Sequence, residues 1–325
     1  MRITQVAVTP PMLADYPESF APLRERGIAV RINDGQYPMD AQSLARFVGT
    51  AEAAIIGLDE ISAILFEMCP ALRVVARNGV GMDNVDLAAA SARGILVTTP
   101  LGANSTSVAE LAIGLTITLA RHVIPTHNRV QRGEWRRTQG MQLSGKTLGI
   151  VGLGRIGKKV AVRAQAFGMR VIANDIAPDA MFAAQHNIEM TGFGRVLEES
   201  DVVSLHVPLT DLTVHLIDRA ALARMKPGAL LINTARGPVI DSAALAEAIT
   251  TGQLAGAALD VHTVEGRIDA VLAGLENVIT TTHLGAYTRE SLIATTEMAV
   301  DSILQILDGA APIGLMNPAC WPPRA

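Results

Sequence analysis

Short apolar runs alternate along most of the chain with longer segments in which apolar residues recur at helical spacing. The runs are rich in Val, Ile, Leu and Ala, as buried parallel strands are. This alternation predicts right-handed βαβ units and a doubly wound α/β fold. Strands are expected at Val6–Val8, Ala54–Ile56, Val74–Val75, Leu96–Thr98, Thr147–Val151, Arg170–Ala173, Val202–Leu205, Ala229–Asn233, Ala257–Leu259 and Val278–Thr280. Helices are expected at Ser43–Val48, Ser105–His122, Ile156–Phe167, Ala220–Met225, Ser242–Thr250 and Arg289–Leu307.

A turn-rich stretch, Thr99–Ala103, indicates a domain boundary before the helix expected from Ser105. About four of the expected strands precede this point and about six follow it, too many for one small domain. A length of 325 residues also favours two domains.

Composition excludes several classes of function. The 27 Lys and Arg against 31 Asp and Glu give a net charge of −4, without the basic excess that binding to nucleic acid requires. The most apolar helix, Val108–Ala120, is too short to span a membrane. The N-terminus lacks the pattern of a signal peptide, and the two cysteines, Cys69 and Cys320, form no disulfide framework, so a cytoplasmic location is expected.

The strongest single motif is the glycine fingerprint in TLGIVGLGRIG, residues 147–157. Gly152 permits a tight turn, Gly154 lets a pyrophosphate approach the backbone, and Gly157 lets helix and strand pack closely. The positive end of the following helix would hold the phosphates. Asp175 lies 18 residues after Gly157, where an acid hydrogen-bonds an adenosine ribose. A carboxylate there repels a 2′-phosphate, so the motif predicts NAD rather than NADP.

Three polar residues suggest hydride-transfer chemistry, in which the protein supplies a proton donor and a group that polarises a carbonyl. Arg236, Glu265 and His283 each follow a different predicted strand, at the edge where open α/β sheets bind ligands. Arg236 suits a substrate carboxylate and the neighbouring keto oxygen. His283 suits acid/base catalysis, with Glu265 orienting its imidazole. Taken singly, each has an ordinary structural explanation, and the proposal requires Glu265 and His283 to lie close together.

Several segments together resemble the D-2-hydroxyacid dehydrogenases, most closely their phosphoglycerate dehydrogenase branch. They are RNGVGMDNVDL (77–87), NSTSVAELAIGL (104–115), GKTLGIVGLGRIGKKVA (145–161), HVPLT (206–210), NTARG (233–237), AALDV (257–261) and HLGAYT (283–288). The resemblance implies two Rossmann-like, doubly wound parallel-sheet domains. A discontinuous outer substrate domain comprises residues 1–100 with 290–325, and residues 101–289 form an inner NAD-binding domain. It also implies a homodimer.

The resemblance assigns site residues by motif match. Arg236, Glu265 and His283 take the catalytic positions, and the substrate positions are Asn78, Gly79, Val80, Gly81, Arg236 and His283. The positions that contact NAD are Val80, Gly152, Gly154, Arg155, Ile156, Gly157, Asp175, Val207, Thr234, Asp260 and Gly285, with Asp260 facing the nicotinamide amide. No metal is expected, because the histidines and cysteines lack metal-ligand spacing.

Two departures and two alternatives accompany the resemblance. The stretch Ile55–Glu60 lacks the arginine with which phosphoglycerate dehydrogenases contact the substrate phosphate, so 3-phosphoglycerate is not the expected substrate. The loop Val261–Gly266 replaces an acidic, proline-ended version. A non-catalytic NAD-sensing protein on the same scaffold, similar to transcriptional corepressors, is one alternative. A phosphite dehydrogenase-like enzyme is the other, whereas formate dehydrogenases carry Gln in place of Glu265.

Overall fold

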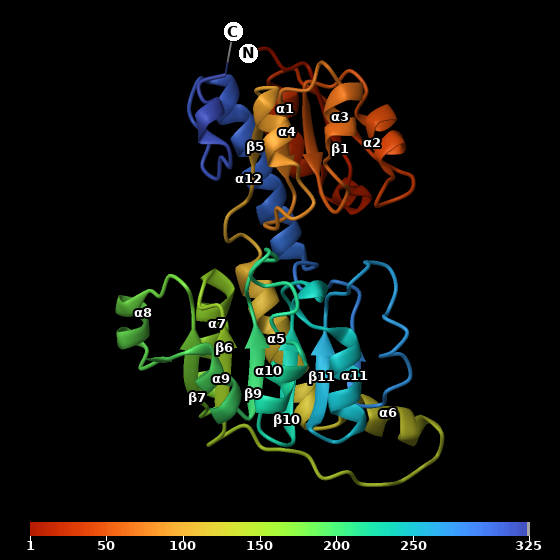
Figure 1. The fold of residues 1–325 in the computed structure, drawn as a ribbon. Coiled ribbons are helices and arrows are strands. Elements are labelled where there is room, and N and C mark those ends of the chain that lie inside the picture. Colours follow the sequence, from red (N-terminus) through yellow and green to blue (C-terminus); the bar gives the residue numbers. More distant parts are fainter. Residues whose placement is uncertain (324–325) are drawn as a thin grey trace. The chain divides into compact units, whose positions relative to one another are not determined.

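The computed structural model describes residues 1–323 and divides into two compact units (Figure 1). The first unit contains Met1–Asn104 and the segment from Thr288 onwards, and the second contains Ser105–Tyr287. The corresponding sequence predictions are 1–100 with 290–325, and 101–289. Hydrophobic periodicity alone does not decide which domain contains the last long helix. In the structure this helix belongs to the first unit.

The first unit is built on a five-stranded parallel sheet of order β2-β1-β3-β4-β5. Alternate residues of each strand face opposite sides, so Ala53 and Ile55 pack with α12 whereas Ala54 and Ile56 join a second core on the other face. The strands are β1 (Gln5–Val8), β2 (Ala29–Ile32), β3 (Ala53–Ile56), β4 (Val74–Arg77) and β5 (Leu96–Thr98). The helices are α1 (Ala21–Glu25), α2 (Ala41–Val48), α3 (Ala63–Met68), α4 (Leu87–Ala92) and α12 (Arg289–Leu307).

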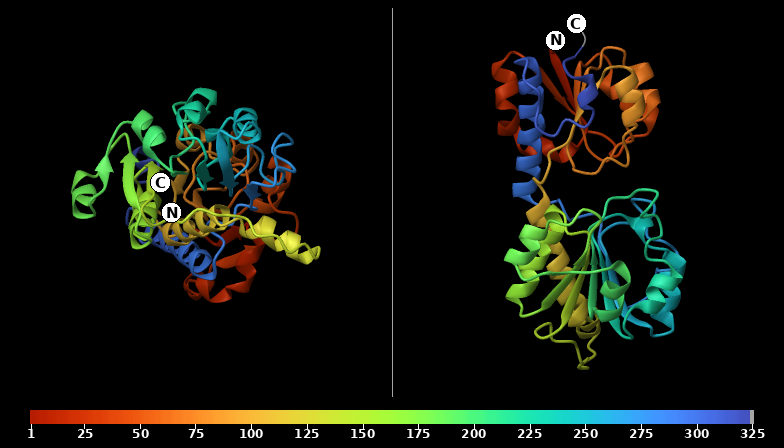
Figure 2. Two further views of the ribbon diagram at one scale, coloured as in Figure 1. Left: turned by 90° about the horizontal axis from the view of Figure 1, so that it is seen from below. Right: turned by 60° about the vertical axis from the view of Figure 1, so that its left-hand side comes forward.

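The second unit is built on a seven-stranded parallel sheet of order β12-β11-β10-β9-β6-β7-β8, with helices on both faces (Figure 2). The strands are β6 (Thr147–Val151), β7 (Arg170–Asn174), β8 (Glu189–Met190), β9 (Val202–Leu205), β10 (Ala229–Asn233), β11 (Leu254–Leu259) and β12 (Val278–Thr280). The helices are α5 (Ser105–Ala120), α6 (Val123–Gln131), α7 (Arg155–Ala166), α8 (Ala180–Gln185), α9 (Phe193–Glu199), α10 (Arg219–Arg224) and α11 (Ser242–Thr250). The expectation of a doubly wound α/β fold is confirmed.

The strand order of the second unit places its ligand-binding edge. From β6 the chain moves outward through β7 to β8, and then returns to lie as β9 on the other side of β6. Open α/β sheets bind ligands at such a reversal, outside the carboxyl ends of the strands. All the strands are parallel, so these ends lie along one edge of the sheet. The glycine turn and the candidate catalytic loops therefore share that edge.

In residues 1–323, no single helix has the length and apolar character needed to cross a membrane. Helices α5 and α6 meet those criteria only when counted together, and they are bent by 59° at their junction.

Candidate active site

The turn between β6 and α7 has the close backbone packing that its glycines predict. Gly152 has a φ of +95° and lies so near the end of β9 that a β-carbon would stand 2.7 Å from the carbonyl oxygen of His206. A β-carbon at Gly157 would stand 2.1 Å from the carbonyl oxygen of Gly152. By contrast, the space beside Gly154 is open, and Gly154 begins α7 without a side-chain cap. The turn is therefore accessible to a group that binds the helix N-terminus.

Asp175 lies just beyond β7 and is tied to this glycine turn. Its Oδ2 accepts a hydrogen bond from the Leu153 N–H at 2.7 Å, and its Oδ1 accepts one from the Ala177 N–H at 2.8 Å. A carboxylate has about four acceptor positions, so these two bonds leave capacity for ribose hydroxyl groups. The side chain is half-buried beside the turn and remains partly accessible.

Two buried polar atoms on neighbouring strands have no hydrogen-bond partner among the described residues. They are Nδ1 of His206, just after β9, and Oγ1 of Thr234, just after β10. The other ring nitrogen of His206 lies 2.9 Å from Oγ of Ser204. Burial lowers the pKa of His206 to about 3, so the ring is neutral. Unpaired buried polar groups are uncommon, and together with the open glycine turn they fit a dinucleotide along this edge.

The structure brings Glu265 and His283 together. Nδ1 of His283 lies 3.0 Å from Oε1 of Glu265, across the loops that follow the neighbouring strands β11 and β12. Burial alone would raise the pKa of Glu265, but the hydrogen bond and charge of His283, with a smaller contribution from the His262 N–H, hold it below its usual value. The carboxylate is therefore ionised and accepts from Nδ1, which leaves Nε2 of His283 for proton exchange.

The loop that carries His283 is anchored by Asp260, which is fully buried at the end of β11. Its carboxylate accepts hydrogen bonds from the N–H groups of Leu284 and Gly285, at 2.7 and 2.8 Å, and from the Thr281 hydroxyl. Its carbonyl oxygen accepts from the N–H of His283 at 2.8 Å. His283 has a φ of +57°, a conformation that costs a non-glycine residue about 1–2 kcal/mol. Asp260 thus holds the loop in shape, a task that the sequence did not indicate.

Arg236 follows β10, the strand next to β11. The Asn233 side chain fixes its loop, donating to the carbonyl oxygen of Arg236 at 2.9 Å and accepting from the Ala235 N–H at 3.0 Å. A β-carbon on Gly237 would stand 2.1 Å from the carbonyl carbon of His262, so this loop lies directly against the one that carries Glu265. Strands β10, β11 and β12 thus bring all three candidate catalytic residues to one edge.

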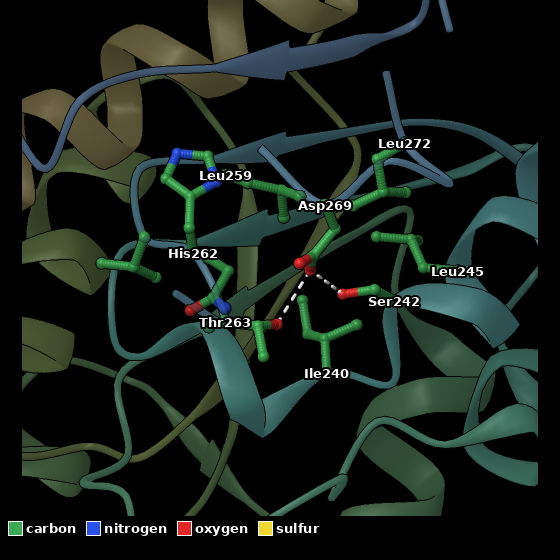
Figure 3. Close-up of a pocket in the computed structure, with 11 residues that line it drawn as sticks. Ile240, Ser242, Leu245, Leu259, His262, Thr263, Asp269 and Leu272 are labelled. Carbon is green, nitrogen blue, oxygen red and sulfur yellow. Dashed lines mark hydrogen bonds between the residues drawn. The ribbon is translucent and has the colours of Figure 1, made fainter. Parts of the chain in front are cut away.

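A small cavity under the Glu265 loop shows how that loop is closed (Figure 3). The Asp269 carboxylate accepts hydrogen bonds from the hydroxyl groups of Thr263, at 2.8 Å, and Ser242. The ring of His262 points away from this cluster (Figure 3). The cavity, about 10 Å³, has room for about one water molecule, so it packs the loop and does not receive a substrate.

The segment Asn78–Gly81 lies in the first unit, where its carbonyl groups are held. The Arg77 guanidinium donates to the carbonyl oxygen of Gly81 at 3.1 and 3.2 Å, and the Thr99 hydroxyl donates to that of Gly79 at 3.1 Å. In a trans peptide the N–H points away from the carbonyl group, so the Val80 N–H is directed away from Thr99. The Asn78 amide donates to two hydroxyl groups of α12. The segment is therefore a loop whose carbonyl groups are held within the unit, with the Val80 N–H directed away from Thr99.

Among the described residues, no group of three His, Cys, Asp or Glu side chains is arranged to hold a metal ion. The remaining predicted cofactor positions, Arg155, Ile156 and Val207, lie at the start of α7 and just after β9. The sequence reasoning gave no role to His262, Asp269 and Thr281. His262 and Thr281 closely follow β11 and β12, which was the available signal, whereas Asp269 lies in the middle of the connecting loop. The partners Thr281 of His262 and Ser242 of Asp269 lie on other segments of the chain.

Comparison with known proteins identifies the same elements. Residues 113–285 match the family described as "D-isomer specific 2-hydroxyacid dehydrogenase, NAD binding domain". The hydroxypyruvate reductase of Thermotoga maritima is 39% identical over 260 residues, which cover 78% of this chain and 84% of that protein. The D-3-phosphoglycerate dehydrogenase of Archaeoglobus fulgidus is 37% identical over 88% of this chain, but the match covers only 55% of that longer protein.

A solved structure supports the fold over nearly the whole chain. The D-lactate dehydrogenase of Aquifex aeolicus, crystallised with NAD and lactic acid, has a TM-score of 0.80 and 30% sequence identity. The match covers 94% of this chain and 96% of that one.

Proposed function

Because the chain belongs to the D-isomer specific 2-hydroxyacid dehydrogenase family, we propose that it interconverts a D-2-hydroxy acid and the corresponding 2-keto acid with NAD(H). The observation that carries this proposal is the 3.0 Å contact between His283 and Glu265, at the sheet edge that also carries Arg236. A histidine paired with a carboxylate, with an arginine on the adjoining loop, can protonate and polarise a keto oxygen.

Different residues of the second unit bind different parts of the cofactor. Bound nicotinamide supplies or accepts the hydride. The open turn at Gly154 and the start of α7 bind the pyrophosphate, and Asp175 accepts from the ribose. Thr234 and His206 offer their unpaired buried atoms to the same ligand.

Arg236, His283 and Glu265 divide the chemistry of the substrate. The Arg236 guanidinium binds the substrate carboxylate and draws electron density toward the keto oxygen. During reduction, Nε2 of His283 gives its proton to that oxygen, and during oxidation it takes the proton back. Glu265 holds Nδ1 and stabilises the protonated ring, because its own lowered pKa keeps it ionised.

The first unit contributes the substrate-binding loop. Asn78–Gly81 binds the substrate carboxylate through backbone N–H groups such as that of Val80, a function consistent with the fixed orientation of the Gly79 and Gly81 carbonyl groups. By motif match we also assign Val80 and Gly285 to the cofactor. The Gly285 N–H is bound to Asp260.

The charges at the carboxyl ends of β3 and β4 favour a substrate without a phosphate. The Asp59 carboxylate is fully buried and accepts from the Thr9 hydroxyl and the Met39 N–H. The Arg77 guanidinium is buried and donates to carbonyl groups, including that of Gly81, so its hydrogen-bonding capacity is committed within the unit.

The neighbouring exposed positions at this end, Leu58 and Glu60, are apolar and acidic. A terminal dianionic phosphate is commonly bound by arginine or lysine side chains, and neither of these exposed positions supplies one. We therefore propose that the substrate is a small keto acid without a phosphate group, such as glyoxylate or hydroxypyruvate, in line with the Thermotoga relative.

One assay tests the reaction and the substrate class together. NADH oxidation is followed with glyoxylate, hydroxypyruvate, pyruvate and 3-phosphohydroxypyruvate, and glyoxylate and hydroxypyruvate are expected to give the highest kcat/KM. NAD binding without turnover of any keto acid would instead indicate an NAD-sensing protein. NAD reduction by phosphite, without keto-acid reduction, would indicate a phosphite dehydrogenase.

We also propose that the protein is a homodimer in the cytoplasm. Exposed apolar side chains occur on α6 and just after it, namely Val123, Ile124, Val130 and Trp135, the last 86% exposed. Such a patch suits association of two copies of this chain, and light scattering is expected to give the mass of a homodimer. Both cysteines in the described residues are unpaired, which fits a reducing cytoplasm.

A further inference from the structure

His262 is a partly buried residue of the second unit that the mechanism above leaves without a task. It follows β11 and lies three positions before Glu265 in the same loop. We propose that His262 is a positioning residue, which holds the His283 loop in the register at which His283 meets Glu265. This inference rests on the proposed acid/base function of that pair.

The imidazole of His262 forms a hydrogen bond between the loops that follow β11 and β12. Its Nε2 lies 2.8 Å from the carbonyl oxygen of Thr281. A carbonyl oxygen only accepts, so Nε2 carries a hydrogen whether the ring is neutral or protonated. The Thr281 carbonyl oxygen therefore accepts from the His262 ring in either form of the ring.

Thr281 is placed where this bond can control His283. The N–H of Thr281 donates to the carbonyl oxygen of Leu259 at 3.0 Å, and its hydroxyl donates to Asp260. With its carbonyl group bound by His262, Thr281 is fixed at all three polar groups, and only Thr282 separates it from His283. The left-handed conformation of His283 is one that the surroundings must enforce.

The backbone of His262 contacts the other two catalytic loops. Its N–H is directed at the Glu265 carboxylate and, after the dominant effects of burial and His283, contributes to the lowered pKa of that group. Its carbonyl carbon stands 2.1 Å from the place that a β-carbon on Gly237, next to Arg236, would occupy. A single residue thus touches the loops of Arg236, Glu265 and His283, which is the arrangement expected of a positioning group.

Two substitutions separate the hydrogen bond from the bulk of the ring. His262→Phe keeps an aromatic ring but removes the donor. His262→Gln restores an N–H, because the glutamine Nε2 is four bonds from Cα, as the histidine Nε2 is. We expect His262→Phe to lower kcat for keto-acid reduction by about 10- to 100-fold, as small misplacements of reacting groups do. His262→Gln should stay within about 3-fold of the unaltered protein, and both should bind NADH normally in a fluorescence titration.

A double-mutant cycle tests whether His262 acts through the catalytic pair. In a Glu265→Ala background the further change His262→Phe should lower kcat by less than about 3-fold, since the pair no longer exists. Loss of the full 10- to 100-fold in that background would overturn the proposal, as would unchanged kcat in His262→Phe alone. If His283→Ala is inactive in the same experiment, the proposed acid/base function is retained even when the proposal for His262 fails. The experiment therefore distinguishes a failure of the His262 proposal from a failure of the proposed function.

A readout independent of turnover completes the test. In proton NMR the Nδ1–H of His283, held by Glu265, should give a low-field resonance that His262→Gln keeps and His262→Phe loses through exchange with water. Retention of that resonance in His262→Phe would contradict the proposal even if the enzyme reaction were absent. His262→Leu is a second donor-free variant should the first fail to fold. The control is His186→Phe, at the end of α8 on the opposite side of the sheet, which should change neither kcat nor the resonance.

Discussion

Gly237 and His262 lie in direct backbone contact: a β-carbon on Gly237 would stand 2.1 Å from the carbonyl carbon of His262 and 2.2 Å from its oxygen. This contact sets the separation between the loop of Arg236 and the loop of Glu265. Because only hydrogen fits in the space, the spacing of the two candidate catalytic loops depends on a glycine that has no chemistry of its own.

Replacing that glycine should therefore damage both stability and activity. Gly237→Ala forces the loops apart, and overpacking of this kind costs about 1–3 kcal/mol in the free energy of unfolding. We expect that loss in urea denaturation, together with a fall in kcat/KM. The control is Gly192→Ala, where the β-carbon meets open space, and which should stay within about 1 kcal/mol of the unaltered protein. Equal stability of the two variants would contradict the close contact.

Asp260→Asn tests the anchor of the His283 loop. Asparagine offers one acceptor oxygen, and its NH₂ group would face a backbone N–H of Leu284 or Gly285. A buried donor without an acceptor costs about 1–3 kcal/mol, so the free energy of unfolding should fall by about that amount and turnover should fall with it. Asp211→Asn, in an exposed loop, is the control. Full activity of Asp260→Asn would show that the loop does not need its anchor.

Asp175→Ala tests the choice of cofactor. Removing the carboxylate removes both the acceptor for the ribose and the repulsion of a 2′-phosphate, so the ratio of kcat/KM with NADH to that with NADPH should fall at least about 10-fold. NADH binding should also weaken, because the Leu153 N–H of the glycine turn loses its partner. An unchanged ratio would mean that Asp175 does not select the cofactor.

The lowered pKa of Glu265 predicts a pH effect with a definite sign. Burial alone would raise the pKa of Glu265, but the effect of His283 is larger and lowers it. The carboxylate therefore stays ionised at pH values below the pKa of an ordinary glutamate. The stabilising effect of the Glu265 carboxylate is fully present above the ordinary pKa of glutamate, and it is lost only as the pH falls through the lowered pKa. In Glu265→Gln the protonated ring of His283 loses its counter-charge. Keto-acid reduction should therefore fall off at a lower pH than in the unaltered protein, and a change in the opposite direction would contradict the pairing.

Much of the fold could be predicted from the sequence because its parallel strands are buried on both faces. Each of the ten expected strands is present, since continuous apolar runs such as Thr147–Val151 can be identified without knowledge of their neighbours. Strand β2 was missed because it is an edge strand with half of its residues exposed, and β8 because it has two residues. The helices missed, among them α3 and α4, are mostly of five to seven residues, too short for a hydrophobic period to be recognised.

Some residues of the candidate site could likewise be predicted from the sequence, whereas the contacts that hold its loops could not. The glycine fingerprint and Asp175 could be predicted because one pattern of strand, glycine turn, helix, strand and acid specifies them together. Arg236 and His283 could be predicted because each closely follows a strand. Two contacts depend on the conformation of the loops. Asp260 binds Gly285, 25 positions away, and His262 binds Thr281, 19 positions away. No local pattern of residue types specifies such pairs.

The most direct test of the account is the comparison of His283→Ala with the unaltered protein in NADH-dependent reduction of glyoxylate and hydroxypyruvate, with NADH binding measured on the same samples. We expect turnover to fall about 10²- to 10⁴-fold while the dissociation constant for NADH changes little. Unchanged turnover in this variant would contradict the assignment of His283 as the acid/base group.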